Sequence, residues 1–74
     1  MNGAEFKLSV HAKRKWTVEV RLFVLLASGQ WHRMGTLCMP SAVWYTSLRP
    51  LLRKGSVASG VVMHVDDTQV QARP

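Results

Sequence analysis

The stretch WTVEVRLFVLLA, residues 16–27, decides the fold of this 74-residue chain. Apolar and polar side chains alternate through its first half, which is the period of a strand with one buried face. Leu25 joins Phe23 in making both faces apolar in the second half, which is typical of a central strand. The alternation predicts a core face that consists of Trp16, Val18, Val20, Leu22, Val24 and Leu26.

Two further strands are expected beside this one. Residues 6–12 show the same alternation, and the charged run of residues 13–15 between the two segments predicts a solvated hairpin tip or strand end. A turn at residues 28–30 predicts a return strand over residues 31–39. Gly35 within that strand indicates a bulge or a close packing contact.

A helix is expected after Pro40, with Ser41 as its N-cap. Its apolar residues recur at three- and four-residue spacing: Val43, Trp44, Leu48, Leu51 and Leu52. The pair Lys54-Gly55 predicts the helix end. Pro50 predicts a kink or two short turns, because an interior proline removes a backbone hydrogen bond.

The final strand is expected over residues 61–65, and the acidic pair Asp66-Asp67 should end it. The chain is therefore predicted to be α+β: a small antiparallel sheet of three to four strands with one helix packed on a face. The predicted order is strand, strand, strand, helix, strand. We expect a single domain over residues 1–74, with an ordered core at residues 5–67 and a flexible tail at residues 68–74.

The composition is that of a folded, strongly basic protein. Apolar residues make up 47% of the chain, and ten Lys and Arg against four Asp and Glu give a net charge of +6. The pI is near 10.5, which favours acidic partners such as DNA, RNA or an acidic protein surface. The alternative is that the excess charge serves solubility alone.

Three features of the sequence indicate an intracellular protein. The only cysteine, Cys38, excludes an intrachain disulfide, so a secreted disulfide scaffold is not expected. The first residues do not resemble a secretory signal. The longest uncharged apolar stretch, residues 22–27, is too short to cross a bilayer, so no membrane association is expected.

Catalytic and metal sites find little support in the sequence. The candidate zinc ligands form no close ligand pair, so we expect no metal and no cofactor; they are His11, His32, His64 and Cys38. A Cys38 nucleophile beside a histidine would still need an oxyanion site and a cleft, for which a domain this small has little room. Asp66 and Asp67 would point to opposite faces of a strand. The protein is therefore expected not to be an enzyme.

Basic residues gather in two clusters, which are the candidate partner-binding residues: Lys13, Arg14 and Lys15 in one, and Arg49, Arg53 and Lys54 in the other. Arg21 and Arg33 would extend a patch across the sheet. If the clusters share a surface, they could neutralise phosphates, with Trp16 or Trp31 stacking on unpaired bases. The favoured alternative is a solvated rim of charges around a core that contains all three tryptophans.

Signatures of nucleic-acid recognition modules are not present in the sequence. A helix interrupted by Pro50 would read a major groove poorly, which makes an acidic protein surface the better partner. Met39, Trp44 and Tyr45 are of the residue types that dominate protein interfaces.

Residues 6–16, FKLSVHAKRKW, resemble the small transcription regulators of Xanthomonas-infecting bacteriophages, as do the small size, the basic charge, the tryptophans and the single cysteine. The resemblance covers overall character and this stretch, contains no diagnostic motif, and carries over no functional residues. It implies a phage-encoded inhibitor in the host bacterial cytoplasm. Such a regulator binds the large subunits of bacterial RNA polymerase, displaces the sigma factor, blocks initiation, and can act as an antiterminator.

A monomer without cofactor is the expected state. The alternative function, of another class, is a small basic nucleic-acid-binding accessory protein.

Overall fold

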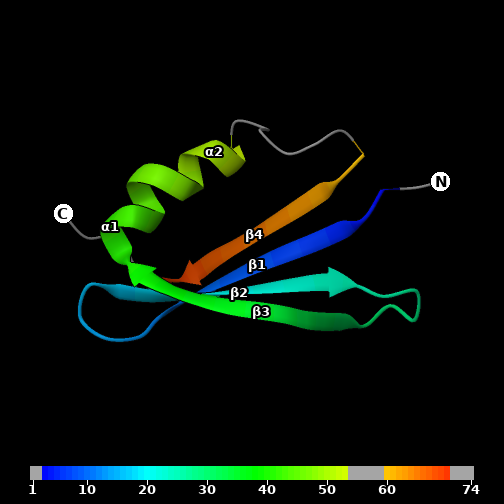
Figure 1. Cartoon of the computed structure of the whole chain (residues 1–74), viewed down its shortest axis with the longest axis horizontal. Helices are drawn as coiled ribbons and strands as arrows, with labels where there is room; N and C mark the ends of the chain where they lie inside the picture. Colours follow the sequence, from blue (N-terminus) through cyan, green and yellow to red (C-terminus); the bar gives the residue numbers. More distant parts are fainter. Residues whose placement is uncertain (1–2, 54–59, 71–74) are drawn as a thin grey trace.

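The computed structural model describes residues 3–53 and 60–70. Four strands form one sheet, and a helical segment lies against one of its faces (Figure 1). In chain order the elements are β1 (Glu5–Ala12), β2 (Thr17–Leu25), β3 (Trp31–Pro40), α1 (Ser41–Val43), η1 (Trp44–Leu48), α2 (Arg49–Arg53) and β4 (Val62–Gln69). This order confirms the α+β class and the predicted succession of strands and helix.

The sheet has the strand order β3-β2-β1-β4 and is mixed. β1 pairs antiparallel with β2, and β2 with β3, whereas β4 runs parallel to β1. The expectation of an entirely antiparallel sheet was therefore wrong. Because the helical segment carries the chain back along the sheet, β4 starts at the end where β1 starts and runs in the same direction. The prediction that the stretch after Trp16 forms a central strand is confirmed.

A bulge interrupts the pairing of β2 with β3 beside Gly35. Leu22 is opposite Gly35, but the next residue, Phe23, is opposite Arg33, so Met34 is the extra residue. This confirms the prediction of an irregularity at Gly35, and such a bulge bends the strand at the edge of the sheet.

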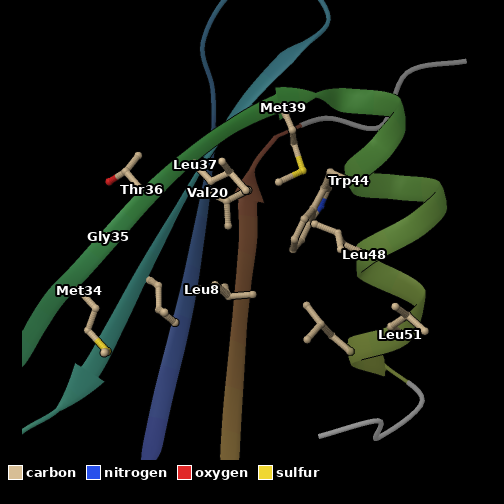
Figure 2. Close-up of a pocket in the computed structure, with 12 residues that line it drawn as sticks. Leu8, Val20, Met34, Gly35, Thr36, Leu37, Met39, Trp44, Leu48 and Leu51 are labelled. Atoms are coloured by element: carbon tan, nitrogen blue, oxygen red, sulfur yellow. The ribbon is translucent and has the colours of Figure 1, made fainter.

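The core lies between the helical segment and the sheet face that it covers. Alternation along the strands directs Val10, Val18 and Val20 toward the helix, where they meet the fully buried Trp44. Figure 2 shows side chains of the sheet and of the helix pointing toward one another across this space. Partly buried residues complete the packing: Leu8, Tyr45, Leu48, Leu52 and Val70.

The helix leaves part of this face uncovered. An apolar groove of about 510 Å³ runs between β3 and the helix. Met34 and Leu37 on β3 and Leu51 on α2 line it and are each more than half exposed (Figure 2).

The helical segment runs without a break from residue 41 to residue 53 and accommodates Pro50 by a turn of π-helix. The Arg49 N–H donates to the Trp44 carbonyl, five residues back, rather than to the usual partner four residues back. The sequence predicted a kink or two short turns near Pro50, whereas the structure has a widened turn just before it. Ser41 does not cap the helix with its side chain, contrary to expectation. Instead its N–H donates to the carbonyl of Trp16, at 2.7 Å.

The ends of β2, β4 and the helix bear on three further expectations. Trp16 lies outside β2. β4 continues through Asp66 and Asp67 to Gln69, so the acidic pair does not end the strand. The predicted helix stop at Lys54-Gly55 lies outside the described residues. Among the residues that the structure describes, no helix is long and apolar enough to cross a membrane.

Candidate functional site

The predicted hairpin tip is a short loop, residues 13–16, which we call the basic loop. Two backbone hydrogen bonds close it, from Lys13 N–H to the Thr17 carbonyl and from Thr17 N–H to the Arg14 carbonyl, both at 3.0 Å. Lys13, Arg14 and Lys15 are all exposed. The loop therefore presents three adjacent cations on a backbone held by the β1–β2 hairpin.

Trp16 completes the loop in an unusual conformation. Its φ of 67° lies in the left-handed region, which a bulky side chain rarely adopts, and its side chain is 59% exposed. The expectation that Trp16 faces the core was wrong. It shares the parity of Val18 in the sequence, but the left-handed residue turns the chain and breaks the alternation. Residues held in such conformations cluster at functional sites.

A hollow of about 590 Å³ lies beside the basic loop. Arg14, Lys15 and Trp16 form one wall, and Ser41, at the start of α1, forms another. Gln69 and Val70, at the end of β4, also line it. The hollow is lined by one aromatic ring and two cations. It could therefore accept a protruding apolar side chain of a partner that has an acidic group beside it.

The three cations of the loop differ in their surroundings. Lys13 Nζ lies 3.4 Å from a carboxylate oxygen of Glu19. The hydrogen bond from Arg21 lowers the pKa of Glu19 below its ordinary value, and Lys13 adds to this effect, so Glu19 is charged at neutral pH. Within residues 3–53 and 60–70, Arg14 and Lys15 form no ion pair, so their charges remain available to a partner.

The second predicted cluster does not join the basic loop. Arg49 pairs with Asp67 (Nε to Oδ2, 2.7 Å) and lies over the Tyr45 ring, 5.6 Å from its centroid. Arg49 is eight residues along the helix from Ser41, about 12 Å at 1.5 Å per residue. Figure 1 shows α1 near the β1–β2 loop and α2 farther from it. Arg53 ends α2, and Lys54 lies outside the described residues.

Other chemistry-bearing residues are dispersed. Residues 3–53 and 60–70 contain no group of three His, Cys, Asp or Glu that could hold a metal ion. His64 pairs with Glu5 at 2.6 Å, and Cys38 is exposed. Asp67 contacts Arg49, whereas Asp66 accepts hydrogen bonds from the Thr68 hydroxyl and backbone, which lower its pKa. The two carboxylates therefore do not converge on one site.

Comparison with known proteins gave no relatives: no family model matches the chain, and neither a curated protein nor a solved structure does.

Proposed function

We propose that the protein is a non-enzymatic inhibitor that binds bacterial RNA polymerase through the basic loop and displaces the sigma factor, blocking initiation, with antitermination as a further consequence of binding. The observation that carries the proposal is Trp16, an exposed tryptophan held in a left-handed conformation between three cations and a hollow.

Tryptophan and arginine dominate the binding energy of protein interfaces, most strongly where a surrounding pocket excludes water. An exposed indole at this position contributes nothing to the core, and its backbone conformation is unfavourable. Burial of the indole in a complex would compensate for the unfavourable backbone conformation of Trp16. The net charge of +6 would also speed the encounter with an acidic surface.

RNA polymerase as the partner rests on the resemblance of residues 6–16 to the phage transcription regulators. That stretch ends in the basic loop, so the part of the chain that carries the resemblance includes the proposed anchor. Displacement of sigma would follow from competition for one surface of the polymerase, by mass action.

The test is co-elution of the protein with purified bacterial RNA polymerase holoenzyme on size exclusion, with sigma followed on a gel. We expect the wild type to co-elute with the core enzyme and to release sigma. Trp16→Ala should weaken the association by roughly 30-fold or more, as expected for truncation of a hot-spot residue. The charge-loss variant Lys15→Gln should reduce it less and make it less sensitive to salt.

Arg33→Gln is the matched control, because it removes one positive charge from an exposed side chain outside the basic loop. It should co-elute as the wild type does. Wild-type protein that fails to co-elute, or Trp16→Ala that co-elutes unchanged, would refute the proposal.

A further inference from the structure

The sheet face opposite the helix carries its own organised set of side chains. We call it the open face, because among the described residues the helical segment covers only the other side (Figure 1). The strand register assigns to it Lys7, Ser9 and His11 of β1, Glu19, Arg21 and Phe23 of β2, Trp31, Arg33, Thr36 and Cys38 of β3, and His64 and Asp66 of β4. None of these residues lies at the tip of the basic loop.

A cation cluster lies on the part of the open face nearest the basic loop and includes Lys13 of that loop. Glu19, which is 9% exposed, is contacted by three cations: Arg21 Nε at 2.6 Å, Lys13 Nζ at 3.4 Å and Arg33 Nη2 at 3.7 Å. Three cations against one carboxylate leave two positive charges without a counter-charge in this cluster. The side chains of Lys13 and Arg33 are both 50% exposed, so a ligand can reach them.

Glu19 also holds these cations in place. Arg33 is fixed further by donating from Nε to the Thr36 hydroxyl, at 2.8 Å, and Arg21 Nη1 lies 3.4 Å from His11 Nε2. Side chains that are already ordered lose less entropy when a ligand binds. The cluster is therefore a pre-organised site for anions.

An aromatic cluster lies next to the cations. Phe23 follows Arg21 on the same face of β2, and Trp31 lies on β3. Lys7 Nζ lies 5.2 Å from the Phe23 ring centroid and 4.8 Å from that of Trp31. The Trp31 ring also meets His64 edge-on, with centroids 6.1 Å apart, so the aromatic side chains extend across the sheet.

We propose that the open face binds single-stranded nucleic acid, with backbone phosphates on the cation cluster and a base stacked on Trp31 and Phe23. The two unbalanced charges complement phosphodiesters. On binding, the flexible Lys7 side chain leaves the rings and takes up a phosphate, which frees an aromatic surface for the base. An acidic protein surface would use the cations but has no need of the adjoining rings, whereas unpaired bases stack on them and paired bases do not.

The first experiment is fluorescence anisotropy of a labelled oligothymidylate of roughly 12 nucleotides, titrated with the protein alone over a range of salt concentrations. We expect saturable binding that weakens as salt rises, and weaker binding to a duplex of the same length. Arg33→Gln should reduce the steepness of the log–log salt dependence by about 0.7, the value for one phosphate contact on a single strand. Trp31→Ala should weaken binding by roughly tenfold.

The matched control is Lys15→Gln, which removes the same charge from the basic loop. It should bind the oligonucleotide as the wild type does. Equal losses in Arg33→Gln and Lys15→Gln would mean that net charge alone attracts the strand, and would overturn the proposal. Absence of binding at about 50 mM salt would also overturn the proposal. Displacement of the oligonucleotide by polyglutamate at equal charge concentration would overturn it as well, because it would identify an acidic protein surface as the occupant.

Cys38 provides a test that needs no substitution on this face. It is the only cysteine, it is exposed, and it is the cross-strand partner of Glu19. Saturating oligonucleotide should slow its reaction with a maleimide at least several-fold. Binding without any protection of Cys38 would place the strand elsewhere and refute the proposal. Because none of these experiments contains polymerase, their failure leaves the proposed function untouched, and failure to co-elute leaves this proposal untouched.

Discussion

The two faces of the sheet are formed by the same strands but differ in burial and in charge. On the covered face Val10, Val18 and Val20 pack against Trp44, and burial of apolar surface stabilises the fold. On the open face Glu19 and Arg21, which alternate with those valines on β2, form a network of charges. The cations of this network are partly exposed, so its ion pairs contribute less to stability than the apolar burial does.

This difference indicates that folding and binding are separated between alternate residues of a single strand. The covered face determines whether the chain folds, and the open face and the basic loop determine what the folded chain can bind. Substitutions on the covered face should therefore change the free energy of unfolding, whereas those on the open face should chiefly change affinity for charged ligands.

The largest effect is expected at Trp44, which is fully buried. Trp44→Ala should lower the free energy of unfolding by about 3–5 kcal/mol, through loss of apolar contact and formation of a cavity. Urea denaturation followed by circular dichroism measures it. Because the buried Nε1 of Trp44 has no hydrogen-bond partner among the described residues, Trp44→Phe should cost clearly less. A loss below about 1 kcal/mol for Trp44→Ala would break the comparison between the faces.

The parts of the fold that could be predicted from the sequence are those that depend on local signals. Alternation along β2 and the hairpin turn at Gly29 are local signals, so the three leading strands and their order were predictable. The parallel pairing of β4 with β1 depends on where the helix delivers the chain, which no local pattern records.

The candidate site was predictable only in part, for the same reason. The run of charge at residues 13–15 correctly indicated a solvated loop, because charged side chains avoid burial wherever they lie. The exposure of Trp16 depends on its left-handed backbone conformation, and the alternation in the sequence wrongly assigned its side chain to the core face. The pairing of Arg49 with Asp67 joins residues 18 positions apart, so a cluster that looked free in the sequence is partly neutralised.

The second prediction concerns Glu19, where stability and binding should change in opposite directions. Glu19→Gln removes the counter-charge of Lys13, Arg21 and Arg33, so the urea midpoint should fall. The oligothymidylate should bind more tightly and with a steeper salt dependence, because three cations are then unbalanced. A loss of both stability and affinity would mean that the ordering of the three cations by Glu19 matters more for binding than the charge that Glu19 neutralises, and would contradict the proposed separation of folding and binding.

Acid titration tests the same carboxylate. The folded protein holds the pKa of Glu19 below its unfolded value of about 4.3, chiefly through the hydrogen bond from Arg21. The stabilisation is therefore fully present above that value and is lost as pH falls through the lower folded pKa. The free energy of unfolding should fall more steeply between about pH 5 and pH 3 in the wild type than in Glu19→Gln. Identical slopes would contradict the ionised Glu19 network.

A smaller effect is expected from the Arg49–Asp67 pair, which lies on the covered side but at its rim. A double-mutant cycle with Arg49→Gln and Asp67→Asn should give a coupling energy of about 0.5–1 kcal/mol, since both side chains are partly exposed to solvent. Neither variant should change binding to polymerase or to the oligonucleotide. A large loss of polymerase binding in Arg49→Gln would return this residue to the binding surface.

A change in stability of similar size is expected in the basic loop, and it should have an unusual sign. In a strand, Gly is normally less stabilising than Ala, but a residue at φ 67° favours Gly, because an L side chain is strained there. Trp16→Gly should therefore be more stable than Trp16→Ala by about 1 kcal/mol, as measured by urea denaturation of the two variants. Both should lose polymerase binding to a similar extent, since both lack the indole. Greater stability of the Ala variant would mean that the loop backbone is not left-handed, and the inference that strain at Trp16 is retained for binding would lose its basis.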